Sequence, residues 1–464
     1  MPSPPRLAAY RALLAVEADR DDLPSALARA RAGLRDERDQ ALAAEIATGT
    51  LRWQGQLDFL IAHFGRRPIA RLDPEILTIL RLSAYQLLHL ARVPAAAATN
   101  EAVTLTRTVR KASAAGFTNA VLRSIWRARQ ALPLPERPTP EVVARIPTDP
   151  DAHRAALDYL GITLSHPRWL AARWLGRYGF DATVRWEQFN NAAAPLTLRA
   201  NSLKTTTADL ALKLRAHGVA TRPTTYAPDG LLVRDGNPLH TPLADLGTFF
   251  VQDEASQLVG LFTAARPGER VLDCCASPGG KTTSMAAAMH DHGLIVAADV
   301  RPRRVELLRT TVERSGAQCI RLVFLDAQEP LPFRGTPFDL VLIDAPCSGL
   351  GTIRRDPEIR WRREEADLSH FAAAQLLMLE NAAHVVRPGG RIVYATCSSE
   401  PDENDAVVAA FLSAHRSFAL VDMRSQAPPG LAAVLDDRSM LRTSPIAHGL
   451  EAFFGAVLGI IHPS

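Results

Sequence analysis

The stretch Val271-Leu-Asp-Cys-Cys-Ala-Ser-Pro-Gly-Gly-Lys-Thr-Thr283 determines the fold expected for this chain. A short apolar run ends in an acid and small residues, and Pro278, two glycines and helix-forming residues follow. This order is typical of a buried parallel strand that turns sharply into a helix, with Gly279 and Gly280 letting a ligand approach the backbone. Free N–H groups at the start of such a helix favour an anionic group of the ligand.

A second apolar run follows this turn and ends in an acidic residue. Residues 294–298 are predicted to form the next strand, and Asp299 comes directly after them. An acid at this place can bind two hydroxyls of a ribose, as in nucleotide-binding βαβ units. We therefore predict a ligand that contains a nucleoside, with its ribose at Asp299.

Other nucleotide-binding motifs match this stretch less well. The run Gly280-Lys281-Thr282 is similar to the end of a triphosphate-binding loop, but that motif needs a glycine where Cys275 stands. The chain has no G-x-G-x-x-G, which disfavours a nicotinamide or flavin cofactor. Taken alone, the stretch could also be a purely structural glycine-rich turn.

Length and composition indicate a soluble globular protein of two or three domains. The chain has 464 residues, of which 47% are hydrophobic, and its mean hydropathy is near zero. No apolar run reaches 18 residues, and the N-terminus does not resemble a secretory signal. Five cysteines without a C-x-x-C pair indicate reduced thiols and offer no zinc spacing. We expect a cytoplasmic protein that binds neither membrane nor metal.

Charge is distributed unevenly along the chain. The whole chain carries a net charge of +4, whereas residues 1–130 hold 19 Lys and Arg against 12 Asp and Glu, a balance of +7. Nearly all the basic residues are arginine, which stacks on bases and grips phosphate with two N–H groups. A genome rich in G and C gives the same bias, so the charge gives modest support to a nucleic-acid partner.

Residues 1–132 are predicted to form an all-α domain, because apolar residues recur there at three- and four-residue spacing. Gly49-Thr-Leu-Arg-Trp53, Leu80-Arg-Leu-Ser-Ala-Tyr-Gln86 and Gly116-Phe-Thr-Asn-Ala-Val-Leu-Arg123 resemble the NusB-type antitermination domain. That resemblance implies an RNA-binding module. The alternative is a helical bundle with a solvated basic face.

The rest of the chain divides into three parts. Residues 133–150 contain several prolines and no clear hydrophobic period, which predicts a linker. Residues 151–250 mix strand-like and helical patterns, which predicts a small α+β connecting domain. In residues 251–464 strands and helices alternate, which predicts an α/β doubly wound, Rossmann-like sheet. Its expected strands are residues 271–273, 294–299, 320–325, 340–344, 391–395 and 452–460.

Polar residues and two thiols gather at the predicted strand ends. Asp326 follows the third strand, Asp344 ends the fourth in a turn that contains Cys347, and Cys397 directly follows the fifth. A single cysteine is most often a small buried hydrophobe. Two of them in small-residue turns at strand ends favour a chemical role, because ligands bind at this edge of such a sheet. A structural role is predicted for the side chains of the other three cysteines, Cys274, Cys275 and Cys319.

These turns closely resemble motifs of the Sun-type family of RNA cytosine-C5 methyltransferases. The matching segments are Cys275-Ala-Ser-Pro-Gly-Gly-Lys281, Asp344-Ala-Pro-Cys-Ser-Gly-Leu-Gly-Thr-Ile-Arg-Arg-Asp-Pro357, and Ala395-Thr-Cys-Ser398 with Glu403-Asn404. With the NusB-like region, the resemblance spans nearly the whole chain and points to the bacterial branch that acts on small-subunit (16S) ribosomal RNA. It implies an S-adenosylmethionine-dependent enzyme, and we expect a monomer.

The resemblance also implies a role for each site residue. The carboxylate end of S-adenosylmethionine would lie against Cys275, Ala276, Ser277, Pro278, Gly279, Gly280 and Lys281. Its ribose would lie on Asp299 and its adenine near Asp326, while Asp344 would sit between cofactor and base. Cys397 would attack C6 of cytosine, Asp344 would protonate or hydrogen-bond N3, and Cys347 would help to release the product.

Several alternatives stay open at this point. The same chemistry could act on transfer RNA, or the chain could be a non-catalytic RNA-binding assembly factor, although such a factor needs no pair of thiols. A DNA cytosine methyltransferase would use only the Pro-Cys cysteine and would lack the Thr-Cys-Ser motif. Arg354, Arg355 and Arg360 are candidates for holding RNA phosphates, and a solvated arginine-rich loop is the alternative for each.

Overall fold

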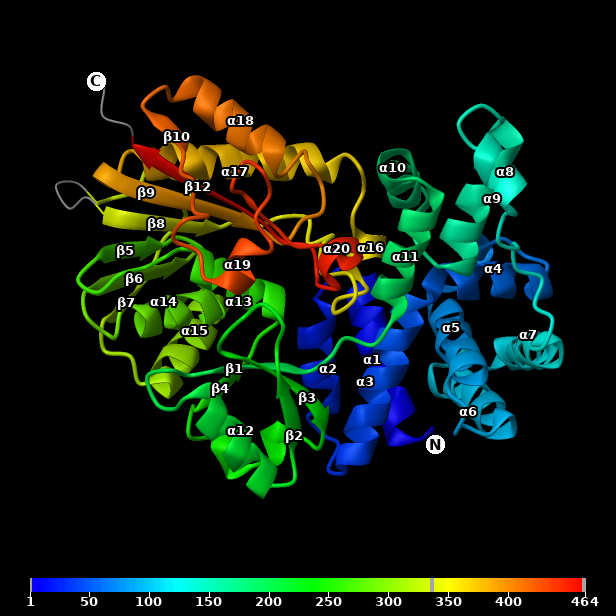
Figure 1. The fold of residues 1–464 in the computed structure, drawn as a ribbon. Helices are drawn as coiled ribbons and strands as arrows, with labels where there is room; N and C mark the ends of the chain where they lie inside the picture. The colour runs from blue at the N-terminus through cyan, green and yellow to red at the C-terminus, as the bar shows by residue number, and fades with distance from the viewer. Residues whose placement is uncertain (1, 334–337, 461–464) are drawn as a thin grey trace. The chain divides into compact units, whose positions relative to one another are not determined.

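The computed structural model describes residues 2–333 and 338–460. The chain forms two compact units, one of residues Met1–Ala193 with Ile353–Glu365 and one of Ala194–Thr352 with Ala366–Ser464. Both are coloured along the chain in Figure 1. Within the described residues, the helices of the first unit are α1 (Pro4–Glu17), α2 (Leu23–Arg31), α3 (Glu37–Arg52), α4 (Gln54–Gly65), α5 (Pro74–His89), α6 (Ala95–Thr108), α7 (Ala115–Ala128), α8 (Pro140–Arg145), α9 (Pro150–Asp158), α10 (Arg168–Tyr178), α11 (Phe180–Asn191) and α16 (Ile359–Arg362).

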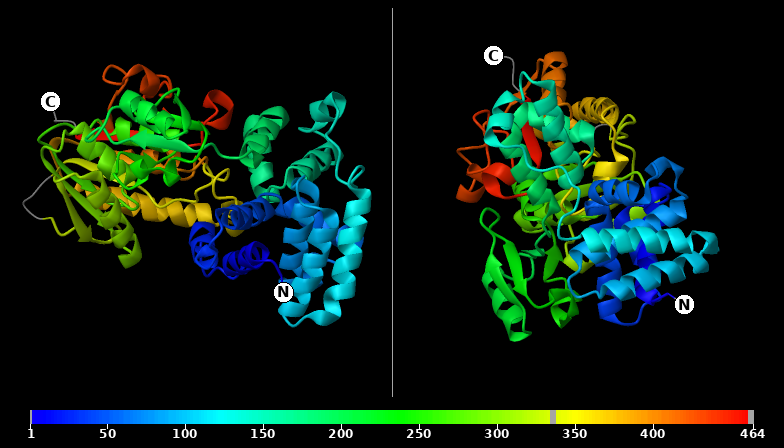
Figure 2. Two further views of the ribbon diagram at one scale, coloured as in Figure 1. Left: turned by 90° about the horizontal axis from the view of Figure 1, so that it is seen from below. Right: turned by 90° about the vertical axis from the view of Figure 1, so that its right-hand side faces the viewer.

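The first part of this unit is helical throughout, as the sequence predicts. Helix α5 lies at its centre, because every residue from Ile76 to Leu87 is buried. Asp73 starts this helix by accepting the N–H of Glu75, and a proline takes the first helical position. The helices from α1 to α7 share one hydrophobic core and are seen from two further sides, in blue to cyan, in Figure 2.

A close contact explains the glycine of one NusB-like segment. A Cβ atom on Gly49 of α3 would lie 1.9 Å from the ring of Tyr85 on α5. Any larger side chain would push these two helices apart. The Tyr85 hydroxyl then donates to Glu45 at 2.5 Å, which satisfies the polar end of a buried ring.

Residues 133–193 form the next part of the first unit. The proline-rich segment expected as a linker contains α8, and Val143 and Ile146 pack on a second apolar core built by α9, α10 and α11. The segment predicted as one α+β connecting domain is divided between the two units. Its helices α9 to α11 belong to the first unit, and its strands belong to the second.

The second unit begins with a small antiparallel sheet. Its strand order is β2-β3-β1-β4, and α12 (Thr207–Ala216) packs against it. The strands are β1 (Thr197–Ala200), β2 (Ala220–Pro223), β3 (Gly230–Asp235) and β4 (Phe249–Val251).

The main sheet of the second unit confirms the predicted doubly wound fold. Its order is β10-β12-β9-β8-β5-β6-β7, with β11 paired to β12, so that the described residues give eight strands. The pairs among β7, β6, β5, β8 and β9 are parallel, whereas β12 runs antiparallel to β9. The strands are β5 (Arg270–Asp273), β6 (Leu294–Asp299), β7 (Ile320–Phe324), β8 (Phe338–Asp344), β9 (Val386–Thr396), β10 (Phe418–Leu420), β11 (Leu441–Arg442) and β12 (Phe454–Ile460).

Helices cover both faces of this sheet, as Figure 1 shows. Alternate residues of one strand enter different cores: Val271 joins the core with α13, α14 and α15, and Leu272 joins the core with α17 and α18. Burial on both faces explains why these strands are continuous apolar runs in the sequence. The helices are α13 (Glu254–Phe262), α14 (Gly280–Ala288), α15 (Pro302–Ser315), α17 (Asp367–Ala383), α18 (Asp405–Ala414), α19 (Pro429–Ala432) and α20 (Pro445–His448).

Two edge strands lie outside the predicted set. The sequence predicts six strands here, whereas the structure adds β10 and β11, which have three and two residues. Runs this short carry no hydrophobic period, so only pairing with β12 defines them. Among the described residues, no helix is long and apolar enough to cross a membrane.

Candidate active site

The sheet order locates a crevice between two loops. From β5 the chain goes to β6 and β7 on one side, and then to β8 and β9 on the other side of β5. Loops that leave the carboxyl ends of β5 and β8 therefore diverge, which is where doubly wound sheets bind ligands. The turn after Asp273 and the turn after Asp344 lie at this point.

The turn after β5 requires a glycine at position 279 and has little room for a side chain at position 280. Gly279 has a φ of +103°, and a Cβ atom there would lie 2.9 Å from Leu308 of α15. Gly280 begins α14, and a Cβ on it would lie 3.2 Å from the amide of Gln252. Gly279 is thus buried against α15, whereas Gly280 is only partly buried at the start of α14. The start of α14 then offers N–H groups that fit an anionic ligand group.

A lysine and an acid bridge the two loops. Lys281 donates to Asp344 at 2.6 Å, and both side chains are largely buried. Burial alone would lower the pKa of Lys281, but the charge and hydrogen bond of Asp344 outweigh it and raise that pKa. Lys281 therefore keeps its positive charge, and it lies at the end of the turn that is predicted to hold the cofactor.

A buried carboxyl lies beneath this pair. Asp273 is fully buried and accepts the hydroxyl of Thr282 at 2.7 Å, while its second oxygen has no hydrogen-bond partner. Burial raises the pKa of Asp273 to about 7, and the hydrogen bond from Thr282 opposes that shift. Such a carboxyl can take up or release a proton near neutral pH.

Asp299 lies at the end of β6 as predicted and is tied to the glycine-rich turn. One of its oxygens accepts the N–H of Arg301, and the other lies 3.5 Å from Nε of Arg304. Arg304 also donates to the carbonyl of Ser277 at 3.1 Å. A half-exposed arginine that joins these two places was not singled out from the sequence, because helix α15 contains several arginines with no distinguishing pattern.

Asp326 lies at the outer end of the predicted site, because its strand β7 is the neighbour of β6, which ends in Asp299. It follows β7, which is three strands away from β8 in the sheet, a distance of roughly 14 Å. Its carboxylate accepts the N–H of Gln328 and so fixes its own turn. Asp326 can contact only the far end of a long ligand that also reaches Asp299.

The two thiols meet at the centre of the site. Cys347 follows β8, Cys397 follows β9, and their sulfur atoms are 3.2 Å apart. The contact with Cys397, then burial, raises the pKa of Cys347 well above its ordinary value. Cys347 is therefore held as the protonated thiol and can donate to Cys397. Cys274 and Cys319 are buried among apolar side chains, which fits the structural role predicted for them.

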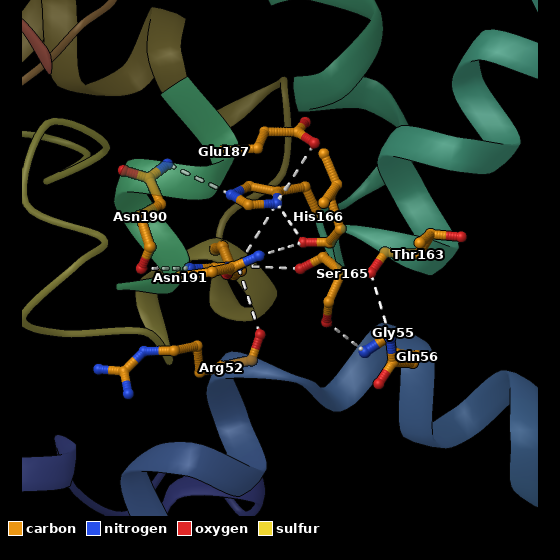
Figure 3. A network of polar contacts seen from close by, with 11 residues as sticks. Arg52, Gly55, Gln56, Thr163, Ser165, His166, Glu187, Asn190 and Asn191 are labelled. Atoms are coloured by element: carbon orange, nitrogen blue, oxygen red, sulfur yellow. Dashed lines mark hydrogen bonds and ion pairs between the residues drawn. The ribbon is translucent and has the colours of Figure 1, made fainter. Parts of the chain in front are cut away.

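The prediction of phosphate binding is wrong for Arg360, whose side chain is 0% exposed. Its guanidinium donates to the carbonyl of Ser165 and the side chain of Asn191, each at 2.9 Å. Figure 3 shows the surrounding polar network, in which Asn190 donates to the ring of His166. The sequence could not distinguish Arg360 from the less buried arginines beside it, because its partners come from distant segments of the first unit.

Removing Arg360 is expected to destabilise the first unit. Arg360→Met leaves the carbonyl of Ser165 and the side chain of Asn191 without their buried donor, which typically costs about 1–3 kcal/mol for each unsatisfied group. The free energy of unfolding is measured through the fluorescence of Trp174 and Trp186, which lie in contact near His166. Arg354→Met is the matched control, and equal unfolding midpoints for the two variants would contradict the structural role of Arg360.

The fold and site together define a Rossmann-like α/β protein that has a glycine-rich turn and a pair of thiols at the crevice where such sheets bind ligands. Two sulfur atoms beside such a crevice suit covalent chemistry on a substrate, with an organic group bound next to it. Among residues 2–333 and 338–460, no group of three or more His, Cys, Asp or Glu side chains could hold a metal ion.

Comparison with known proteins identifies the family. The model of the 16S rRNA methyltransferase RsmB/F family matches residues 261–459, that of the NusB family matches residues 3–127, and that of an RsmF/B-like ferredoxin-like domain matches residues 166–240. The ribosomal RNA small subunit methyltransferase B of Pseudomonas putida is 34% identical over 91% of this chain and 92% of its own. The chain belongs to the RsmB/F family of RNA methyltransferases.

Two further relatives cover similar lengths. The probable ribosomal RNA small subunit methyltransferase B of Bacillus subtilis is 31% identical over 90% of each chain. The crystal structure of PH0851 is 26% identical, covers 99% of each chain and superposes with a TM-score of 0.80. The helical first part and the methyltransferase sheet are thus shared over nearly the whole length.

Proposed function

We propose that this protein forms 5-methylcytosine in small-subunit (16S) ribosomal RNA, with S-adenosylmethionine as the methyl donor and a covalent adduct between Cys397 and cytosine C6. The contact of Cys347 and Cys397 at 3.2 Å carries the proposal. Methylation of an oxygen or an exocyclic nitrogen needs no sulfur nucleophile, whereas methylation at C5 does, because C5 is too weak a nucleophile to take a methyl group directly. The relatives are named for the small subunit of ribosomal RNA, which supports the substrate.

The chain provides a matching set of residues for the cofactor. The turn from Cys275 to Lys281 would hold its carboxylate end at the start of α14, and Asp299 would hold its ribose. Asp326 would lie near its adenine. When bound, S-adenosylmethionine supplies an electrophilic methyl group for C5.

The first step makes C5 nucleophilic. The sulfur of Cys397 forms a bond with C6, and the electron pair of the C5–C6 double bond moves toward the ring carbonyl and N3. As negative charge develops on N3, Asp344 passes it a proton that its partner Lys281 supplies across their hydrogen bond, which stabilises that charge. A target base must leave its stack to reach these groups.

The last step releases the product. A base removes the proton from C5, the pair reforms the C5–C6 double bond, and the bond between C6 and the sulfur of Cys397 breaks. Cys347 suits this role because the largest cause of its raised pKa is its contact with Cys397. Bonding of Cys397 to C6 ends that contact, so the thiol of Cys347 can lose its proton more readily when a base is needed.

Asp299→Ala is expected to weaken S-adenosylmethionine binding by about tenfold or more. The charge-assisted hydrogen bonds that it removes contribute roughly 1.5–3 kcal/mol. The fold should stay intact, because Asp299 lies at the end of β6 and its partner Arg304 is half-exposed. Isothermal calorimetry measures the change, and Asp326→Ala provides a comparison at the far end of the site. Wild-type affinity in Asp299→Ala would remove this residue from the cofactor site.

The direct test of the proposed reaction uses purified protein, radiolabelled S-adenosylmethionine and unmodified RNA. Digestion of the RNA to nucleosides should yield the label in 5-methylcytidine. Label in another nucleoside would overturn the proposal. The reduced thiols that this mechanism needs also favour a cytoplasmic location.

A further inference from the structure

A buried carboxylate joins the two cysteine loops. Glu403 lies just before α18, and its side chain is 0% exposed. One of its oxygens accepts the N–H of Ser348 at 2.8 Å and the amide of Gln375 at 3.1 Å. The other oxygen accepts the hydroxyl of Ser348 at 2.5 Å and the hydroxyl of Ser398 at 2.6 Å. Four donors therefore converge on one carboxylate.

The sequence positions of these donors connect Glu403 to both cysteines. Ser348 directly follows Cys347, and Ser398 directly follows Cys397. The two serines belong to loops after different parallel strands, β8 and β9, and their hydroxyl oxygens are 3.1 Å apart. Glu403 thus bonds the loop of one thiol to the loop of the other, in addition to the direct bond that the N–H of Gly351 donates to the carbonyl of Cys397 at 2.9 Å.

Two further side chains form hydrogen bonds to the residues next to each cysteine. Gln375 of α17 also donates to the carbonyl of Pro346, the residue before Cys347. Asn404 donates to the carbonyl of Ser398 at 3.0 Å and accepts the hydroxyl of Thr396, the residue before Cys397. Residues on both sides of each cysteine are therefore held by hydrogen bonds.

We propose that Glu403 is a positioning residue that sets the separation of the Cys347 and Cys397 sulfur atoms by bonding to the residue after each of them. This role rests on the proposed function, in which one thiol attacks and the other assists release. Catalytic groups must be held within about 0.5 Å of their productive geometry, and a misplacement of about 1 Å can cost about a hundredfold in rate. The negative charge of Glu403 also contributes to the raised pKa of Cys347, so it favours the thiol form before attack.

A carboxylate is needed because of the number of donors. An ionised carboxylate accepts on both oxygens, whereas the amide of glutamine accepts on one and donates on the other. In Glu403→Gln, one of the two oxygens becomes an NH2 group that no longer accepts a hydrogen bond. The serine hydroxyls can rotate to accept a bond from this group, but at least one of the four donors to residue 403 is then weakened. Glu403→Ala removes all four bonds. The proposal therefore predicts a graded effect, with alanine more damaging than glutamine.

The separation of the sulfurs can be measured without RNA or cofactor. Diamide takes two electrons and two protons from two neighbouring thiols and leaves a disulfide, so the rate at which the Cys347–Cys397 cross-link forms reports how often the sulfurs meet. Mass spectrometry of digested full-length protein quantifies that peptide pair. The cross-link should form about tenfold more slowly in Glu403→Ala, because several bonds to a charged group are lost, and less slowly in Glu403→Gln.

Asp405→Asn is the matched control, since this carboxylate lies two residues further on and pairs with Arg442. It should cross-link at the wild-type rate. If Glu403→Ala is unstable, the cross-linking rate of Glu403→Gln, whose side chain has the same size as glutamate, provides the test. Wild-type cross-linking rates in a folded Glu403 variant would overturn the proposal.

A second readout uses the proposed reaction. Glu403→Ala should bind S-adenosylmethionine with wild-type affinity, lower kcat by about a hundredfold and leave a persistent protein–RNA adduct. A kcat that falls with unchanged cross-linking and no adduct would mean that Glu403 only stabilises the fold. Because cross-linking involves no substrate, it distinguishes failure of this proposal from failure of the proposed RNA chemistry.

Discussion

Replacing Cys397 with alanine is expected to abolish methyl transfer, lowering the rate by roughly 10⁴-fold or more. No bond to C6 can form without this sulfur, so C5 never becomes nucleophilic. Cofactor affinity should not change, because Cys397 follows β9 whereas the glycine-rich turn follows β5. Transfer of a labelled methyl group to RNA measures the loss.

Cys319→Ala is the control for this substitution. Its thiol is buried at the start of β7, away from the two cysteine loops, and the variant should transfer methyl groups at the wild-type rate. Substantial methylation by Cys397→Ala would show that another group attacks the base.

Replacing Cys347 with alanine is expected to trap the enzyme on its RNA. Cys397 can still attack C6, but the C5 proton is not removed efficiently and the bond to sulfur persists. Turnover should fall by about 10²-fold or more, which is the usual contribution of a positioned acid or base. A denaturing gel should show an RNA-dependent band of reduced mobility.

The double variant separates the two roles. Cys347→Ala combined with Cys397→Ala should lose the slow band, because the trapped bond belongs to Cys397. A band from Cys397→Ala alone would reverse the assignment of attacking and releasing thiol. The sulfurs lie 3.2 Å apart, so distance alone does not assign the roles. The raised pKa of Cys347 favours Cys397 as the attacking group.

The parts of the fold that the sequence predicts well are those set by local pattern. Buried parallel strands are continuous apolar runs that end in polar residues, so the apolar pattern alone puts Asp299 and Asp344 at strand ends, where the structure has them. Gly279 follows from the same logic, because a sharp turn into a helix needs a positive φ. The resemblance added separate roles for Cys347 and Cys397, whereas their contact at 3.2 Å is seen only in the structure.

The parts that the sequence does not predict depend on contacts between distant segments. Residues 353–365 come after the turn that contains Cys347 but pack with the first unit, where Trp361 donates to the carbonyl of Leu51. Nothing local marks Arg360 as buried or Arg304 as the partner of Asp299. Glu403 belongs to a recognisable motif, yet its four donors come from three separate loops and helices, so its role needs the structure.

The central claim is tested most directly by bisulfite sequencing of total RNA from a strain that lacks this gene. We predict that one cytosine of small-subunit ribosomal RNA loses its protection from conversion. Wild-type protein should restore the protection, and Cys397→Ala, expressed to the same level, should not. Unchanged protection in ribosomal RNA, or loss of protection only in transfer RNA, would contradict the account.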